Sequence, residues 1–325
     1  MSVSTRLKAL CAISVWGLVL SLALSSCAVT NEKVATEKTK STVAFCVPSR
    51  YVMFAYPDYA STDRDQMLLV NVSRLLDTKA VTKRERAEVF YELGIIYDRL
   101  GMEATARSMF MNALAENRRY AAPYNFVGIY FAEDGRFQEA LDAFDSGLEL
   151  DPSDAYVNFN RGIVLYLAGR AATALPDFRR FYRADPSDPY RLLWLYLCEK
   201  ALGDDEQALK NLSLRRDHAS DKARAENWGF FIVSLYLKEK SLDDFFVELR
   251  KSEKNPDEFA DRLCEGYFYV GMQSLLRGDE KEAYDYMSLS VATRRYAFLE
   301  YRYALRLMRD LGQKRGLFVT PEIKL

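Results

Sequence analysis

The chain has 325 residues, enough for one extended solenoid or two ordinary domains. Its 45 basic and 46 acidic residues nearly cancel, so the charge balance gives no electrostatic case for binding nucleic acid. The 21 Tyr and 19 Phe, against 15 Gly and 9 Pro, suit packed helix pairs better than a loop-rich β fold.

The N-terminus has the layout of a secretory signal. Basic residues at positions 6 and 8 precede an apolar run over 9–24, which is short for a membrane-spanning helix. The run ends in Leu24-Ser25-Ser26-Cys27, which resembles a bacterial lipobox. We therefore expect residues 1–26 to be cleaved off between Ser26 and Cys27, and the Cys27 thiol to carry the lipid. The alternative is an ordinary signal peptide, or an uncleaved anchor, in which the cysteine is a coincidence.

Residues 27–60 are expected to form the lipid anchor and a tether. Ala28, rather than Asp, follows the lipobox cysteine, which by resemblance to enterobacterial sorting directs the protein to the outer membrane, with its body in the periplasm. Residues 31–41 are polar and without periodicity, as a flexible tether would be. The stretch 48–59 is aromatic and holds two prolines, so we expect packing rather than regular structure to order it.

The segment 61–80 should contain an N-terminal helix over Asp63–Asp77. Its apolar residues cover more than one face, so the helix needs contact on several sides. A second copy of the chain could supply part of that contact, which predicts a homodimer; burial wholly within one chain is the alternative. The apolar residues are Met67, Leu68, Leu69, Val70, Val72, Leu75 and Leu76.

The strongest pattern in the chain is a repeat of 34 residues. Four columns of like residues share this step, and the phrase Asp-Pro-Ser-Asp at Asp151 returns at Asp185. The columns are a first glycine (Gly94, Gly128, Gly162), a second glycine (Gly101, Gly135, Gly169, Gly203), an alanine (Ala106, Ala140, Ala174, Ala208) and a large apolar residue (Phe110, Phe144, Phe178, Leu212).

Each column has a physical reason. The first glycine and the alanine let two antiparallel helices approach closely, and the second glycine ends the first helix in a left-handed conformation. The large apolar residue fills space between pairs, and Pro152 and Pro186 stop the second helix. The pattern resembles the tetratricopeptide-repeat family, which implies an all-α, right-handed superhelix of antiparallel helix pairs. Region 81–222 then holds four repeats, at about 87–120, 121–154, 155–188 and 189–222.

A further copy falls at 264–297 and, with a capping helix, makes up the region 264–312; residues 313–325 form a tail. Gly203 and Gly278 lie 75 residues apart, seven more than two repeats, so 223–263 should hold an irregular helix pair. We expect its first helix at 226–238 and its second after the capping box Ser241-Leu-Asp-Asp244. Thr82-Lys-Arg-Glu85 is a similar start signal before the first repeat.

The sequence offers little that could carry out catalysis. It holds no Gly-x-Ser-x-Gly elbow, phosphate-binding loop or His-Glu-x-x-His helix. The one histidine, His218, lies in a charged stretch and is expected to be solvated. Cys46, Cys198 and Cys264 lack the short spacing of a zinc site. We therefore expect no enzyme activity, no metal and no cofactor; a hydrolase built on an acidic pair is the alternative, with no motif behind it.

Recognition of other proteins is the remaining chemistry. The first helix of each pair lines the concave surface of such a solenoid. Its inward positions here are mostly aromatic, which suits contacts with a bound peptide or helix; the alternative for each ring is a place in the core between repeats. The predicted groove residues are Tyr91, Asn125, Tyr156, Phe159, Tyr166, Tyr190, Trp194, Phe268 and Tyr269.

Several stretches also resemble the NlpI-type outer-membrane lipoproteins of gammaproteobacteria, both inside and outside the repeats. They are 143–152, 160–163, 188–197, 227–233 and 301–305. The resemblance implies a homodimeric adaptor that gathers peptidoglycan hydrolases and presents a cell-wall endopeptidase to a tail-specific periplasmic protease, affecting envelope maintenance and cell division. The alternative is a repeat lipoprotein that pilots a secretin or pilus component to the outer membrane.

Overall fold

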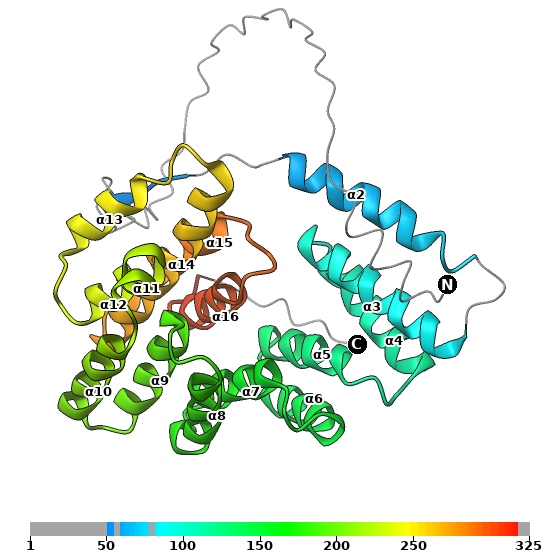
Figure 1. Cartoon of the computed structure of the whole chain (residues 1–325), viewed down its shortest axis with the longest axis horizontal. Helices are drawn as coiled ribbons and strands as arrows, with labels where there is room; N and C mark the ends of the chain where they lie inside the picture. The colour runs from blue at the N-terminus through cyan, green and yellow to red at the C-terminus, as the bar shows by residue number, and fades with distance from the viewer. Residues whose placement is uncertain (1–50, 55–58, 78–81, 318–325) are drawn as a thin grey trace, which may run out of the picture.

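The computed structural model describes residues 51–54, 59–77 and 82–317. In these ranges the chain is helical and forms a curved stack of antiparallel helix pairs (Figure 1), which confirms the predicted fold class. No helix in the described part is long and apolar enough to cross a membrane. The predicted signal peptide, the Ser26–Cys27 cleavage site, the tether at 31–41 and the tail beyond Leu317 lie outside the described residues.

The stack starts with α2 (Tyr59–Ser73) and ends with α16 (Leu299–Lys314), and a short helix α11 (Asp221–Glu226) interrupts it. Six pairs lie between them in the described residues: α3 (Lys83–Arg99) with α4 (Glu103–Glu116), α5 (Ala122–Glu133) with α6 (Phe137–Leu150), α7 (Ala155–Leu167) with α8 (Ala171–Ala184), α9 (Pro189–Ala201) with α10 (Asp205–His218), α12 (Gly229–Tyr236) with α13 (Leu242–Arg250), and α14 (Pro256–Leu276) with α15 (Glu280–Ala292).

The first glycine column marks the place where the two helices of a pair touch. A Cβ added at Gly128 would lie 2.5 Å from a ring carbon of Phe144, and one at Gly94 would lie 2.6 Å from Phe110. No real Cβ fits at that distance, so only glycine lets the phenyl ring of the second helix lie flat against the first. The second glycines Gly101, Gly135, Gly169, Gly203 and Gly278 all have positive φ, as predicted for helix ends.

The Asp-Pro-Ser-Asp phrase forms the joint between one pair and the next. Asp151 Oδ1 accepts hydrogen bonds from the Ser153 backbone N–H at 3.0 Å and the Ser153 hydroxyl at 2.7 Å. Asp154 then caps α7 by accepting from the N–H groups of Tyr156 and Val157. The same bonds recur at Asp185, Ser187 and Asp188 before α9. The phrase therefore stops one helix and starts the next with the same local hydrogen bonds.

The structure of the irregular pair, α12 with α13, resembles that of the repeat pairs more than its sequence indicates. The predicted helix 226–238 is wrong in its bounds, because the helix observed there is α12, Gly229–Tyr236. Asn227 separates α11 from α12, and its Oδ1 accepts a hydrogen bond from the Gly229 N–H at 2.9 Å. Lys238 ends α12 with φ 61°, in the place that the second glycine takes in the other pairs. The capping boxes at Ser241 and at Thr82 are confirmed.

Two N-terminal segments pack on opposite halves of the stack. The predicted helix Asp63–Asp77 is offset, because α2 ends at Ser73 and the chain then tightens into a turn. Asp65 of α2 binds Arg99 of α3 in a bidentate ion pair of 2.7 and 2.9 Å. Earlier in the chain, the Tyr51 ring stacks on Phe246 of α13 with centroids 4.8 Å apart. Packing therefore holds Tyr51 in place, as expected for the stretch 48–59, but Phe54 is exposed and Tyr59 begins α2. Residues 48–50 and 55–58 of that stretch lie outside the described residues.

Candidate protein-binding surface

The structure divides the nine predicted groove residues into three classes. Tyr156, at the start of α7, is exposed over 60% of its surface. Tyr91, Asn125, Tyr166 and Tyr190 are half-buried. The other four take the alternative of a place in the core and present no surface to a partner in this conformation: Phe159, Trp194, Phe268 and Tyr269.

Trp194 shows why these rings are buried. The indole of Trp194 stacks on Phe178 of α8 at 5.9 Å between centroids, and the ring of Phe268 on α14 lies 6.0 Å away. Tyr303 of α16 closes the cluster from the remaining side at 6.3 Å. Periodicity places Trp194 on the inward face of α9 but does not show that α14 and α16 fill the space in front of it.

The half-buried residues are already engaged within the chain. The Asn125 Oδ1 accepts from Asn160 Nδ2 at 2.8 Å, which links α5 to α7. Tyr91 packs edge-on against Phe126, and burial, followed by the charges of Glu92 and Asp154, raises the pKa of Tyr91 to about 12. Tyr166 packs edge-on against Trp194. These contacts join neighbouring helix pairs.

The concave side is closed by α16, which runs through the centre of the curve (Figure 1). Arg302 of α16 is buried and forms ion pairs with Glu133 of α5, at 2.6 Å, and with Asp98 of α3. The Tyr130 hydroxyl donates to Asp98 at 2.5 Å, and the guanidinium lies over the Tyr130 ring. Burial raises the pKa of Glu133 although Arg302 opposes that shift. We call these four residues the Arg302 cluster.

The sequence analysis missed the Arg302 cluster. Arg302 lies 204 residues after Asp98, and no spacing rule joins positions so far apart. The three charged residues look like ordinary helix-surface charges in the sequence, because each sits among other charged residues. Their burial follows only from the curvature that brings the last helix against the first pairs.

At its N-terminal end α16 brings two carboxyl groups together. Glu300 of α16 and Glu265 of α14 are half-buried, the Tyr190 hydroxyl donates to Glu265 at 2.6 Å, and the Tyr269 hydroxyl donates to Glu300 at 3.3 Å. Burial raises the pKa of both, and the charge of Glu300 raises that of Glu265 further. The docked position of α16 is therefore favoured at low pH, and this contribution is lost as the pH rises from the ordinary carboxyl range toward the raised pKa values.

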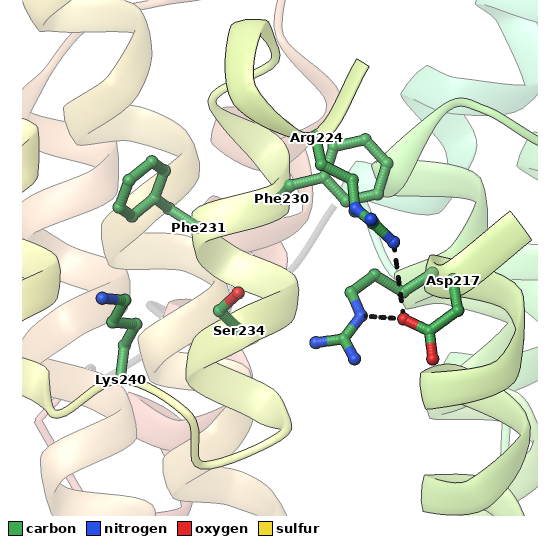
Figure 2. A pocket seen from close by; sticks show the side chains of 7 residues that line it. Asp217, Arg224, Phe230, Phe231, Ser234 and Lys240 are labelled. Carbon is green, nitrogen blue, oxygen red and sulfur yellow. Dashed lines mark hydrogen bonds and ion pairs between the residues drawn. The ribbon is translucent and has the colours of Figure 1, made fainter. Parts of the chain in front are cut away.

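An open cavity of about 390 Å³ lies where α10, α11 and α12 meet (Figure 2). Asp217 forms ion pairs there with Arg216 and Arg224, so these cations are largely neutralised. Ser234 and Lys240 also line it, but no hydrogen bond joins their side-chain groups among the described residues. The arrangement shows no activated nucleophile.

The other residues considered for chemistry lie apart. His218 is exposed at the end of α10. Cys198 and Cys264 are buried free thiols, and burial raises the pKa of Cys198 to about 12. No group of ligand residues that could hold a metal occurs in the part of the chain that the structure describes. Cys46 lies outside the described residues.

Residues 128–189 match the family model for the tetratricopeptide repeat. They span α5 to α8 with their glycines, rings and Asp-Pro-Ser-Asp joint. The fold is a tetratricopeptide-repeat superhelix. Repeats of this family are protein-binding modules, so the coarse functional class is protein interaction.

Solved structures with similar folds share little sequence with this chain. A tetratricopeptide repeat protein from Parabacteroides merdae is 13% identical, with a TM-score of 0.48 over 78% of this chain and 95% of that one. PilF of Pseudomonas aeruginosa is 17% identical, with a TM-score of 0.41 over 75% and 90%. YrrB, described as having an unusual peptide-binding site, is 14% identical, with a TM-score of 0.39 over 68% and 91%. No likeness of partners follows at these values.

The burial difference between two predicted groove residues gives a direct test. Replacing Trp194, which is 2% exposed, with Ala should reduce the free energy of unfolding by about 3–5 kcal/mol, because a large cavity remains. Tyr156→Ala should change it by less than about 0.5 kcal/mol, as at an ordinary surface position. Thermal and urea denaturation, followed by circular dichroism, measures both. Equal losses of stability would contradict the assignment of Tyr156 to the surface and Trp194 to the core.

Proposed function

We propose that this protein is a lipid-tethered adaptor of the outer membrane, whose periplasmic body gathers peptidoglycan hydrolases and promotes proteolysis of a cell-wall endopeptidase. The repeat superhelix carries the adaptor part of the proposal, since stacked helix pairs offer an extended surface for protein contacts. The envelope part rests on the lipobox-like Cys27 and on the sequence resemblance to NlpI-type lipoproteins. On this proposal the protein itself catalyses nothing.

The open surface around Tyr156 is the best-exposed aromatic part of the predicted groove. Tyr156 packs against Phe181 with ring centroids 5.9 Å apart, so its position is fixed although its outer face is free of protein. A rigid, half-supported ring loses little conformational entropy when a partner covers it. Tyrosines of this kind are frequent hot spots of interfaces.

Reconstitution tests the adaptor function. The protein alone should cleave neither peptidoglycan nor protein, and it should accelerate degradation of the endopeptidase when a tail-specific protease from the same organism is added. The dose response should be bell-shaped, because excess scaffold separates the two partners onto different copies. Tyr156→Ala should slow degradation roughly tenfold, which is what one aromatic hot spot contributes. Gel densitometry over time measures the rate.

Phe54→Ala is the matched control, since this ring is also exposed but lies in the N-terminal segment. Degradation of either substrate by the pure protein would contradict the adaptor proposal. Loss of a secretin from the outer membrane in a deletion strain, with the endopeptidase level unchanged, would instead support the piloting alternative.

The anchor is a separate part of the proposal. Cys27→Ser should abolish labelling with radioactive palmitate and release the protein from the outer-membrane fraction, because a hydroxyl does not accept the diacylglyceryl group. Cys11→Ser changes a thiol inside the predicted signal peptide and should leave labelling unchanged. Normal labelling of the Cys27→Ser protein would refute the lipoprotein assignment.

The homodimer proposal rests on the outer face of α2. Met67 and Val70 are 70% and 51% exposed there, whereas Leu69 and Leu76 are half-buried against α3. Met67→Glu with Val70→Glu should therefore convert a dimer into a monomer without disturbing the fold. Light scattering at tens of micromolar measures the mass, and Met102→Glu with Met111→Glu is the control at two other exposed methionines. A monomeric mass for the unchanged protein would refute the dimer.

A further inference from the structure

The helix α16 occupies the place where a partner was expected. It contacts α14 and α15, which precede it, and also α5 on the other side of the curve. Tyr303 packs against Trp194, and Glu300 accepts a hydrogen bond from Tyr269. This helix of the same chain therefore contributes to the burial of two predicted groove residues, Trp194 and Tyr269.

The polar contacts of α16 make both favourable and unfavourable contributions to the free energy of its docking. The Arg302 cluster joins it to α3 and α5, but removing three charges from water offsets much of what their attraction contributes. The Arg302 cluster therefore determines where α16 docks more than how tightly it docks.

Two features oppose docking. The Tyr303 hydroxyl is buried and has no hydrogen-bond partner among the described residues, a state that costs free energy relative to water. Glu300 also lies beside Glu265, with Asp188, Asp261, Tyr190 and Tyr269 around the pair, and Arg262 is the cation whose charge opposes the raised pKa of Glu265. If α16 served only as a permanent cap, its docking would be more stable with phenylalanine at 303 on α16 and glutamine at 265 on α14.

We infer that α16 is a displaceable occupant of the groove, and that the surface beneath it binds an amphipathic helix of a partner protein. That helix would present an arginine to Asp98 and Glu133 and an aromatic ring to Trp194, as α16 does with Arg302 and Tyr303. The inference rests on the proposed adaptor function, because it names the kind of partner segment that the groove binds.

The covalent link explains how α16 and a partner helix compete. A helix attached to the same chain has a high effective concentration at the groove, so it keeps weak partners out. A partner with better polar pairing than α16 would displace it from the groove, and the released face of α16, with Tyr303, would then be exposed. The closed chain would then be the resting form of the adaptor.

Amide hydrogen exchange of the purified full chain tests displacement without any partner. After correction for intrinsic rates, amides of residues 303–313 should exchange at least tenfold faster than those of residues 267–272 in the core of α14. Tyr303→Phe should slow exchange of α16 about fivefold, the effect of removing one unsatisfied hydroxyl. Glu265→Gln should also slow exchange of α16 at pH 8. Arg302→Met should accelerate it at least tenfold, because the variant leaves the carboxylates of Asp98 and Glu133 buried without their cation, although the intact cluster adds little net stability.

Tyr182→Phe on α8 and Glu253→Gln ahead of α14 are matched controls that should leave exchange of α16 unchanged. If Arg302→Met unfolds the whole chain, Tyr303→Phe and Glu265→Gln, which should slow exchange of α16, still test whether α16 is displaceable. Exchange of residues 303–313 at the rate of α14 in every variant would overturn the inference, because α16 would then be part of one cooperative core. That result would leave the adaptor function standing.

A labelled peptide of residues 296–316 tests the groove itself. By fluorescence anisotropy it should bind the Arg302→Met chain at least tenfold more tightly than the unchanged chain, in which the attached helix blocks the site. The same peptide with Arg302→Met should lose most of this binding. Failure of the unchanged peptide to bind the Arg302→Met chain would overturn the assignment of this surface as a helix-binding groove.

Discussion

The contact of a glycine with a phenyl ring across the first three helix pairs, α3/α4, α5/α6 and α7/α8, is the constraint on which the rest of the structure depends. At Gly94 and Gly128 a Cβ would lie within 2.6 Å of the facing ring, so the helices approach more closely than any other residue permits. The close contact brings the two helices of such a pair together, and the two Asp-Pro-Ser-Asp joints link α6 to α7 and α8 to α9. Stacking of successive pairs produces the curved chain seen in Figure 1.

Curvature brings distant parts of the chain together. Arg302 meets Asp98 and Glu133 because the last helix returns to the first pairs, and the same geometry covers Trp194 with Tyr303. In an extended solenoid each repeat contacts only its neighbours. Here the terminal helix adds long-range contacts, so the protein has a closed form that a simple sum of repeats does not describe.

This closure changes where partner binding is expected. An open groove would bind through most of its inward rings, but in the closed chain the exposed aromatic surface is concentrated at Tyr156, and the inner face is reached only by displacing α16. The outer face of α2, with Met67 and Val70, remains available at the same time. The proposed pairing of two copies and the proposed recognition of partners would therefore use separate surfaces.

The sequence alone determined the helix pairs, their 34-residue step, the left-handed glycines and the capping boxes at Thr82 and Ser241, because each depends on residues close together in the chain. It missed the repeat-like character of the irregular pair, where Lys238 adopts the conformation usual for glycine. Only the tertiary structure decided which inward rings are surface and which are core. The periodicity of one helix determines which of its faces points inward. The exposure of that face depends on the helices that the curved chain places against it, and Arg302 and Tyr303 of α16 come from the far end of the sequence.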